Sequence, residues 1–311
     1  MCGIFGFVGK KYTRSQDDLV LMKDSLLHRG PDHFDFFTQA FLDYELNFGH
    51  VRLSIIDVSS AGRQPMHSKT GRYFIVFNGE IYNYREIKKE VEALNPLIEW
   101  VGNSDTEVLL AAIELFGLQT CVSKLVGMFS FALCDRDSRE LYLVRDRIGE
   151  KPLYYGYQDD QLFFASELRA IEQHSKFEKE LNEPAAVGFL LRSYIPANLS
   201  IYEHIFKVPP GTILEFKLDS VKERIAPNIF TYWSLAEIVK KAKSNPYQAS
   251  YDDAKRELNS LLITAVKEQC IADVPLGAFL SGGIDSSLVC AIMKKHVKSR
   301  LQTFTIGMPV P

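Results

Sequence analysis

The sequence lacks the features typical of secreted, membrane-bound and nucleic-acid-binding proteins. Its 311 residues include five cysteines, an odd number without a C-x-x-C pair, which argues against a disulfide framework or a thiolate metal cluster. The net charge of −3 leaves no basic field for a nucleic acid or an anionic membrane. The opening apolar run, Ile4 to Val8, stops at Lys10 and is too short for a signal peptide or a membrane span. We therefore expect a cytoplasmic protein that binds neither nucleic acid nor membrane.

Length and composition predict two domains. A chain of 311 residues exceeds one average domain, and its 46% hydrophobic and 24% charged residues are ordinary globular values. The amino-acid composition changes near residue 219, where a charged segment begins. A basic segment that contains Ser and Pro follows it. We expect a first domain over 2–218, a linker over 219–250 and a second domain over 251–311.

Short apolar runs bounded by Gly, Asn, Asp or charged pairs predict strands in the first domain. They cover residues 3–8, Ala40–Phe48, Tyr73–Phe77, Phe129–Leu133, Leu141–Val144 and Leu162–Ala165. Helical spacing predicts helices over Asp17–Leu27, Tyr84–Leu94 and Thr106–Phe116. Many strands with few helices favour stacked sheets flanked by helices.

The second domain begins with a different pattern. An amphipathic helix over Tyr251–Gln269 precedes a strand over Val274–Leu280, a helix from Asp285 and a strand over Thr303–Ile306. This order predicts one βαβ unit of a parallel sheet.

Cys2 is a candidate nucleophile. Once Met1 is removed, the Cys2 thiol lies a few bonds from a free α-amine, whose pKa of about 8 leaves much of it neutral and able to accept the thiol proton. The alternative is a small cysteine that only packs. The rest of the chain has to decide between them.

Five further stretches carry polar groups in an unusual density. They are His28-Arg29-Gly30-Pro31-Asp32, His50-Val51-Arg52-Leu53-Ser54-Ile55, Asn78-Gly79-Glu80-Ile81-Tyr82-Asn83, Gly102-Asn103-Ser104-Asp105-Thr106-Glu107 and Arg145-Asp146-Arg147-Ile148-Gly149-Glu150-Lys151-Pro152-Leu153-Tyr154. With Met1-Cys2-Gly3-Ile4-Phe5-Gly6 in front, their order and spacing resemble the N-terminal-nucleophile glutamine amidotransferases, in the asparagine synthetase branch. The resemblance spans essentially the whole chain. It implies an α+β four-layer αββα sandwich, followed by the start of an α/β parallel-sheet nucleotide-binding domain.

The resemblance assigns a glutamine site. Hydrolysing an amide through a thioester requires a thiolate, a proton acceptor, an oxyanion hole and a clamp for the amino-acid end. Cys2 supplies the first two, and the Asn78 amide with the Gly79 N–H supplies the oxyanion hole. Arg52 can bind the substrate carboxylate bidentately. The implied glutamine-binding set is Arg52, Leu53, Ile55, Asn78, Glu80 and Asp105, in which Glu80 and Asp105 receive the α-ammonium.

Each of these residues also has a plain structural interpretation. Asn78-Gly79 is a common type I′ hairpin turn. Asp105 could only cap a helix, and Arg52 could form a surface ion pair of little consequence.

Other polar residues of these stretches receive structural roles. We assign no chemistry to His28 and His50, because the α-amine already provides the base. By resemblance, Arg145-Asp146-Arg147 and Lys151 form an ion-pair network against the second domain.

The stretch Ser281-Gly282-Gly283-Ile284-Asp285-Ser286-Ser287 is a candidate phosphate loop between a strand and a helix. A Gly-Gly turn before a capped helix is the alternative. No Gly-Lys-[Ser/Thr] follows, so it is not a Walker A loop. It resembles the S-G-G-x-D-S loop of ATP pyrophosphatases, and the implied ATP site is Leu280, Ser281, Gly282, Gly283, Asp285, Ser286, Ser287 and Ile306. Leu280 and Ile306 would flank the adenine, and Asp285 would bind Mg²⁺ on the pyrophosphate.

Together the two sites imply a glutamine-hydrolysing asparagine synthetase. Ammonia released at Cys2 would cross to β-aspartyl-AMP and give asparagine, glutamate, AMP and pyrophosphate, with glutamine, ATP and aspartate as substrates and no prosthetic group. One alternative is an amidotransferase of this architecture with another carboxylate acceptor, a sugar acid or a peptide. Another is a non-catalytic remnant. Dimers are common in this family, and the sequence leaves a homodimer open.

The end of the chain suggests a fragment. A doubly wound nucleotide domain needs about five strands, and only two are predicted here before Pro309-Val310-Pro311. We therefore expect a truncated chain that keeps the glutaminase residues and cannot complete asparagine synthesis.

Overall fold

The computed structural model describes residues 1–41, 43–297 and 300–307. The chain divides into two compact units, and the division falls between Leu235 and Ala236. The ending at Pro309-Val310-Pro311, on which the expectation of truncation depends, lies outside the described residues.

The first unit is built mainly of strands. They are β1 (Gly3–Gly9), β2 (His33–Ala40), β3 (Glu45–Arg52), β4 (Met66–His67), β5 (Tyr73–Ile81), β6 (Gly127–Asp135), β7 (Glu140–Arg145), β8 (Tyr154–Gln158), β9 (Gln161–Ala165), β10 (Ile205–Lys207), β11 (Thr212–Lys217) and β12 (Asn228–Thr231). Its helices are α1 (Ser15–Leu26), α2 (Tyr84–Leu94), α3 (Asp105–Phe116), α4 (Leu118–Lys124), α5 (Leu168–Ile171) and α6 (Glu183–Arg192), with short 3-10 turns at Ser60–Gly62 and Leu218–Glu223.

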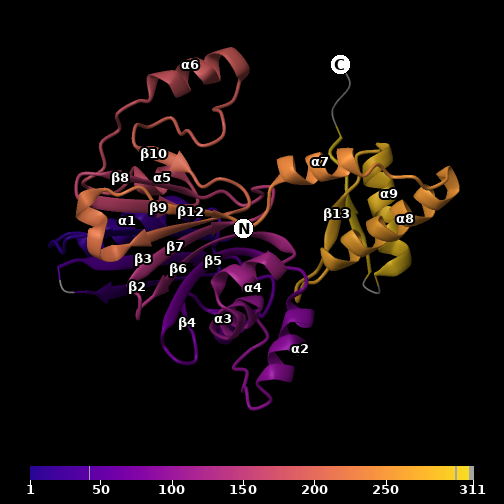
Figure 1. Ribbon diagram of the computed structural model, residues 1–311, viewed down its shortest axis with the longest axis horizontal. Helices are drawn as coiled ribbons and strands as arrows, with labels where there is room; N and C mark the ends of the chain where they lie inside the picture. The colour runs from indigo at the N-terminus through magenta and orange to yellow at the C-terminus, as the bar shows by residue number, and fades with distance from the viewer. Residues whose placement is uncertain (42, 298–299, 308–311) are drawn as a thin grey trace. The chain divides into compact units, whose positions relative to one another are not determined.

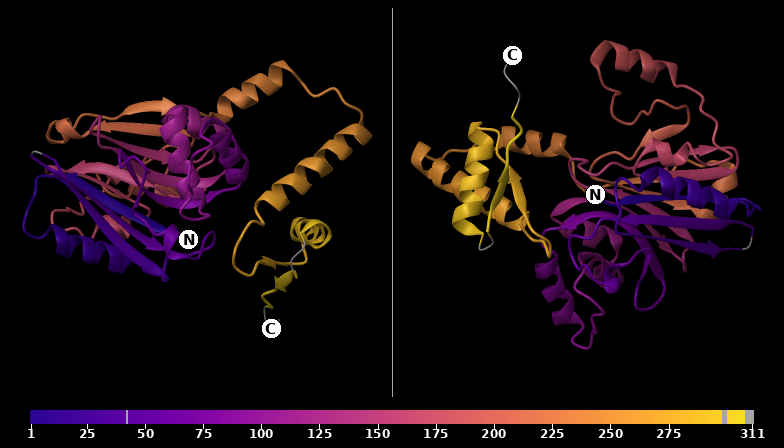
Figure 2. Two further views of the ribbon diagram at one scale, coloured as in Figure 1. Left: turned by 90° about the horizontal axis from the view of Figure 1, so that it is seen from below. Right: turned by 180° about the vertical axis from the view of Figure 1, so that it is seen from behind.

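Two antiparallel sheets stack face to face. One has the order β10-β8-β9-β1-β3-β2 and the other β12-β11-β7-β6-β5-β4. Helices α1 and α5 lie on the outer face of the first sheet, and α2, α3 and α4 lie beside the second (Figures 1 and 2). The four-layer αββα sandwich predicted from the resemblance is confirmed.

Strand β1 explains why the opening run is apolar throughout. Ile4 and Val8 point into the core between the sheets, whereas Phe5 and Phe7 pack on the side of α1. Side chains alternate between the faces of a strand, so a strand covered on both faces carries large apolar groups at successive positions. Burial of each such side chain contributes roughly 1.5–3 kcal/mol.

One hairpin of the first sheet differs from the sequence prediction. The run Ala40–Phe48 was expected as one strand, but β2 ends at Ala40 and β3 begins at Glu45. Apolar content alone does not reveal a turn inside a run. Strand β2 was not predicted, because it is an edge strand whose side chains are largely exposed or half-buried.

The second sheet also extends into the segment expected as a linker. Asn228–Thr231 forms β12 and pairs with β11, and α7 (Leu235–Ser244) follows. The division between the units lies inside the expected linker, 219–250. Part of that segment is therefore regular structure rather than a tether.

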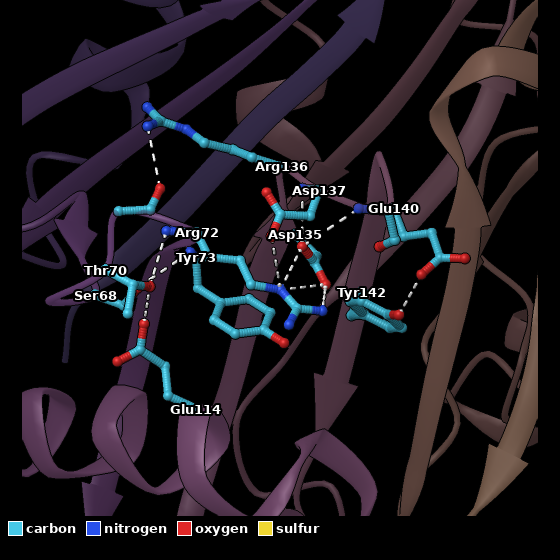
Figure 3. A network of polar contacts seen from close by, with 12 residues as sticks. Ser68, Thr70, Arg72, Tyr73, Glu114, Asp135, Arg136, Asp137, Glu140 and Tyr142 are labelled. Atoms are coloured by element: carbon cyan, nitrogen blue, oxygen red, sulfur yellow. Dashed lines mark hydrogen bonds and ion pairs between the residues drawn. The ribbon is translucent and has the colours of Figure 1, made fainter.

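A polar network supports the start of β5 (Figure 3). The Arg72 guanidinium donates to both oxygens of Asp135, with Nε–Oδ1 3.0 Å and Nη2–Oδ2 2.6 Å. Asp135 also accepts the backbone N–H of Asp137 at 3.0 Å. The carboxylate thus links β5 to the turn between β6 and β7.

The second unit contains the predicted βαβ arrangement. Helix α8 (Tyr251–Glu268) precedes β13 (Gly277–Phe279), α9 (Ile284–His296) and β14 (Gln302–Phe304). The two strands pair in parallel, with Gly277 opposite Gln302. Both are shorter than predicted. Among the described residues, none of the helices combines the length and the apolar character that a membrane crossing needs.

Candidate functional site

Strand pairing brings Cys2 to the end of β3. Gly3 lies opposite Val51 in the antiparallel register, so Cys2 precedes the pairing just where Arg52 and Leu53 follow it. The Cys2 Sγ lies 3.4 Å from the Leu53 N–H and 3.5 Å from the Leu53 carbonyl oxygen. The thiol is therefore held against the backbone of the residue after Arg52.

Asn78, Gly79 and Glu80 come from the facing sheet. They lie inside β5 and pair with β6, so the hairpin-turn interpretation of Asn78-Gly79 is wrong. A Cβ on Gly79 would meet the Met128 carbonyl oxygen at 2.3 Å, so a side chain has no room there. The Asn78 side chain is 1% exposed, and its Nδ2 has no hydrogen-bond partner among the described residues. An unpaired buried amide donor is uncommon and calls for a ligand or a water.

Asp105 begins α3 but is not its cap. The hydroxyl of Ser104 caps the helix by accepting the Glu107 N–H at 3.2 Å. The Asp105 carboxylate instead accepts the Ile81 N–H at 3.0 Å, which ties α3 to the end of β5. Burial raises the pKa of Asp105 to about 6, although backbone N–H groups favour its ionised form.

Arg52 is buried, so its interpretation as a surface ion pair is wrong. Its guanidinium donates to the Ser59 carbonyl at 2.9 Å and to the Asp57 carbonyl. A Cβ on Gly62 would lie 2.1 Å from Arg52 Nη2, so this glycine gives the guanidinium its place. Two of five N–H donors are thus used on the backbone, and the side chain can still bind an anion.

These residues surround one cavity of about 130 Å³. All eight residues predicted for the glutamine site line it: Cys2, Arg52, Leu53, Ile55, Asn78, Gly79, Glu80 and Asp105. A thiol, an unpaired amide donor, a guanidinium and two carboxylates therefore face one space. This set can hold a zwitterion and attack a carbonyl carbon. A larger hollow of about 820 Å³ lies elsewhere in the unit, between α2, α3 and residues 66–70, and it contains no cysteine.

Titration of the thiol and the terminal amine follows from burial. Burial raises the pKa of the Cys2 thiol, while the amino terminus and Arg52 act in the opposite direction. Burial also lowers the pKa of the terminal amine, which here belongs to Met1. A neutral amine beside a protonated thiol is the starting state for proton transfer between them.

Lys151 reaches the cavity, which the sequence did not predict. It lines the space with Met1 and Glu80 and is 5% exposed. Burial lowers its pKa, and the nearby carboxylates of Glu80 and Glu150 oppose this. It was expected in an ion-pair network, because a lysine beside other charges gives no local sign of pointing inward.

The neighbours of Lys151 bond mainly to the backbone. The Arg145 guanidinium donates to three carbonyls, including that of Lys151 at 2.8 Å. The Asp146 carboxylate accepts the N–H groups of Gly149 at 2.7 Å and of Lys151 at 2.9 Å. This loop is thus organised by carboxylate and guanidinium bonds to the main chain.

Gln64, His28 and His50 form hydrogen bonds that hold other parts of the first unit in place. Gln64 accepts the Phe77 N–H at 2.6 Å, directly before Asn78, and no sequence signal marks it. His50 donates from Nε2 to the Phe77 carbonyl at 3.1 Å, and burial lowers its pKa to about 3. His28 lies 3.1 Å from the Glu167 carboxylate. Neither histidine lines the cavity.

The second predicted site forms a loop in the second unit. Gly282 has a φ of 81°, a left-handed conformation that suits glycine. The hydroxyls of Ser281 and Ser286 lie 3.0 Å apart, and α9 begins at Ile284. Leu280 and Ile306 follow the two paired strands, and the Leu280 N–H bonds to the Phe304 carbonyl at 2.9 Å. Ser287 and Asp285 lie exposed in the first turn of α9, with Gly283 directly before it.

Asp285 alone provides a carboxylate for a metal ion in this loop. Among the described residues, no cluster of three or more His, Cys, Asp or Glu side chains could hold a metal. A Mg²⁺ ion bound chiefly by phosphate oxygens needs only one or two protein carboxylates. The single carboxylate is compatible with Mg²⁺ carried on a nucleotide.

The family described as "Glutamine amidotransferase domain" matches residues 1–232. The chain belongs to the glutamine amidotransferase family. After this domain in the sequence, the family described as "Asparagine synthase" matches residues 257–310. The predicted family is confirmed.

Curated relatives align over nearly the whole chain. A putative glutamine-hydrolysing asparagine synthetase 2 of Methanocaldococcus jannaschii is 35% identical over 99% of this chain and 60% of its own length. The glutamine-hydrolysing asparagine synthetase 1 of Bacillus subtilis is also 35% identical, over 99% of this chain and 46% of its own. The chain thus spans about half the length of the curated relatives it matches.

A solved structure has the same fold. The glutamine phosphoribosylpyrophosphate amidotransferase of B. subtilis aligns with a TM-score of 0.53 at 17% identity, over 98% of this chain and 65% of that one. At 17% identity this likeness shows a shared fold and nothing about activity.

Proposed function

We propose that this amidotransferase hydrolyses glutamine at Cys2. The observation that carries the proposal is the Asn78 amide, buried and unpartnered in the cavity that also contains the Cys2 thiol. Opposite charges for a zwitterionic amino acid line the same space, with Arg52 for the carboxylate and Glu80 and Asp105 for the ammonium. The family match over residues 1–232 supports it.

The proposed reaction begins once Met1 is removed. The freed α-amine of Cys2 takes the thiol proton, and the thiolate attacks the side-chain carbonyl carbon of glutamine. The Asn78 amide and the Gly79 N–H hold the resulting oxyanion. The amine returns the proton to the leaving nitrogen, ammonia departs and a thioester remains. Water then cleaves the thioester, which releases glutamate and restores the thiol.

Glutamate release from glutamine tests this proposal. Cys2→Ala and a variant extended before Met1, which keeps the Cys2 amine in a peptide bond, should both be inactive. Asn78→Ala should lower kcat by about 10²–10³-fold, the usual effect of removing one oxyanion donor. Cys121→Ala, a buried cysteine outside the cavity, is the control and should keep activity. Equal activity of wild type and Cys2→Ala would contradict the proposal.

We further propose that the whole protein is an ATP-dependent carbon–nitrogen ligase that amidates aspartate through β-aspartyl-AMP. The match of residues 257–310 to the asparagine synthase family and the names of the curated relatives support it. In this proposal the backbone and hydroxyls from Ser281 to Ser287 bind the pyrophosphate, and Leu280 and Ile306 flank the adenine. Asp285 would hold Mg²⁺ on the nucleotide, where it offsets phosphate charge.

Aspartate-dependent exchange between ATP and pyrophosphate tests the ligase proposal. Exchange that requires aspartate, and that Asp285→Asn and Ser281→Ala reduce, would support it. Exchange that only another carboxylic acid supports would replace aspartate as the acceptor. The domain division at 2–218 and 251–311 is part of this proposal. We also propose a homodimer, and analytical ultracentrifugation tests it.

A further inference from the structure

Asp57 is a buried carboxylate directly behind the cavity, on the loop after β3. It is 7% exposed and does not line the cavity itself. Its φ of 52° is in the left-handed region, which is uncommon for a residue other than glycine. In this conformation its backbone carbonyl accepts a hydrogen bond from the Arg52 guanidinium.

The Asp57 side chain bonds to two separate loops. Oδ1 accepts the Ser59 N–H at 3.0 Å and the Ser59 hydroxyl, which holds the loop whose Ser59 carbonyl binds Arg52. Oδ2 accepts the Asn103 N–H at 2.7 Å, two residues before Asp105. One carboxylate therefore connects the loop that orients Arg52 to the segment that leads into Asp105.

The second loop is shaped for this contact. A Cβ on Gly102 would lie 2.4 Å from Asp57 Oδ2, so only glycine allows the loop to approach so closely. The Gly102 N–H is bound on its other side by the Glu107 carboxylate at 2.9 Å. Burial by itself would raise the pKa of Asp57, but hydrogen bonds from Ser59 and Asn103 and the charge of Arg52 keep it below its usual value. The Asp57 carboxylate, which we call the bracket because it joins the loop at Ser59 to the loop at Asn103, is therefore ionised at neutral pH.

We propose that Asp57 is a positioning residue that holds Arg52 and Asp105 at the separation of the two charges of an α-amino acid. The inference rests on the proposed glutamine hydrolysis. In an α-amino acid both charges are attached to one carbon, so the partners must be fixed relative to each other. Cys2 directly precedes β1 and Asn78 lies in β5, so the two sheets place them rather than the loop that carries Asp57. We therefore expect the chemical step to depend little on the Asp57 carboxylate.

Asp57→Asn tests the inference with the smallest change. The amide keeps one acceptor oxygen and turns an NH₂ group toward either Asn103 or Ser59, which breaks one half of the bracket. KM for glutamine should rise about 10-fold or more, the equivalent of a hydrogen bond to a charged group, while kcat stays within about 3-fold. The preference for glutamine over 4-aminobutanamide, which lacks the α-carboxylate, should narrow, because Arg52 is no longer held in place.

Asp135→Asn is the matched control. Asp135 is also a buried carboxylate that accepts loop N–H groups, but it is outside the cavity. It should lower the melting temperature without changing KM or the substrate preference. An unchanged KM in Asp57→Asn, or a fall in kcat alone, would overturn the bracket.

Calorimetry separates this inference from the proposed function. Glutamine binding is measured in Cys2→Ala with and without Asp57→Asn. Weaker binding in the double variant supports the bracket even when wild type hydrolyses no glutamine, an outcome that would contradict only the function. Equal binding in the two variants overturns the bracket.

Discussion

At the scale of residues, the cavity contains polar groups that weaken the fold. The Asn78 amide is buried without a partner among the described residues, and Asp105 is a buried carboxylate near Glu80. An unsatisfied buried polar group typically costs about 1–3 kcal/mol. Such costs persist in a folded chain where the groups serve a ligand.

Asp105→Asn should therefore stabilise the protein while removing glutamine binding. The pKa of Asp105 is raised to about 6 in the folded protein, so the protonated carboxyl favours folding. This contribution to the free energy of unfolding is complete below the pKa of the unfolded chain and is lost as the pH rises through about 6. The variant should melt above wild type at pH 8, and the difference should vanish near pH 4. An amide cannot pair with the substrate ammonium, so KM should rise. Thermal unfolding across this pH range and glutaminase kinetics measure both effects, and equal melting temperatures at pH 8 would contradict the prediction.

Some site residues were predictable and others were not. Cys2 follows the initiator methionine, and Arg52 and Asp105 occur in dense polar stretches, so sequence reasoning reached them. Asp57 and Gln64 were missed because each bonds to a segment that lies farther along the chain, Asp57 to Asn103 and Gln64 to Phe77. An isolated Asp or Gln in a loop gives no local sign of such a partner.

At the scale of elements, the contact between Arg72 and Asp135 stabilises the start of β5 in the second sheet. The Arg72 side chain is half exposed, whereas Asp135 is buried. The guanidinium contacts the Asp135 carboxylate (Figure 3). Burial would raise the pKa of Asp135, but the hydrogen bonds from Arg72 and the loop N–H groups lower it. The ionised carboxylate is thus a stabilising group of the β5–β6 pair.

Arg72→Ala should destabilise the first unit by about 1–3 kcal/mol at pH 7, because the Asp135 charge stays buried with only backbone donors. The pKa of Asp135 is lowered in the folded protein, so its ionised form favours folding. This stabilisation is present above the pKa of the unfolded chain, about 4, and is lost as the pH falls through the lower pKa of the folded protein. The loss in Arg72→Ala should therefore shrink below about pH 4, as urea unfolding at several pH values would show.

Arg169→Ala is the control for this prediction. Its ion pair with Glu167, 3.5 Å long, is solvent-exposed on the arginine side, and such pairs contribute about 0–1 kcal/mol. Equal losses in the two variants would contradict the role of Asp135.

At the scale of the whole molecule, the two units differ in how much they bury. The first has a continuous core between two sheets. Among the described residues from Ala236 on, only Cys290, Ile292 and Met293 are buried, and β13 and β14 form a two-stranded sheet. Two strands rarely support independent stability.

Hydrogen exchange should therefore separate the units. Amides of β13, β14 and α9 should exchange through openings that cost well below the about 5–15 kcal/mol of a stable domain. Amides of β1, β5 and β6 should be protected longest, because these strands lie inside their sheets. Mass spectrometry of peptides resolves the two classes. Equal protection in both units would show that the second unit is stable as it is.

The sequence by itself determined the local structure and the family. Periodicity predicted α2 and α8 and the parallel βαβ order, because these follow from side-chain spacing within one segment. The polar stretches identified the residues around the cavity, since each carries its chemistry wherever the chain places it.

Only the tertiary structure decided how these residues are held. Asn78-Gly79 has the composition of a turn and lies in a strand, because pairing with β6 outweighs local preference. Lys151 points into the cavity, and Asp57 connects two loops 46 residues apart. Such contacts depend on which segments meet in the fold, and no single stretch of sequence contains that information.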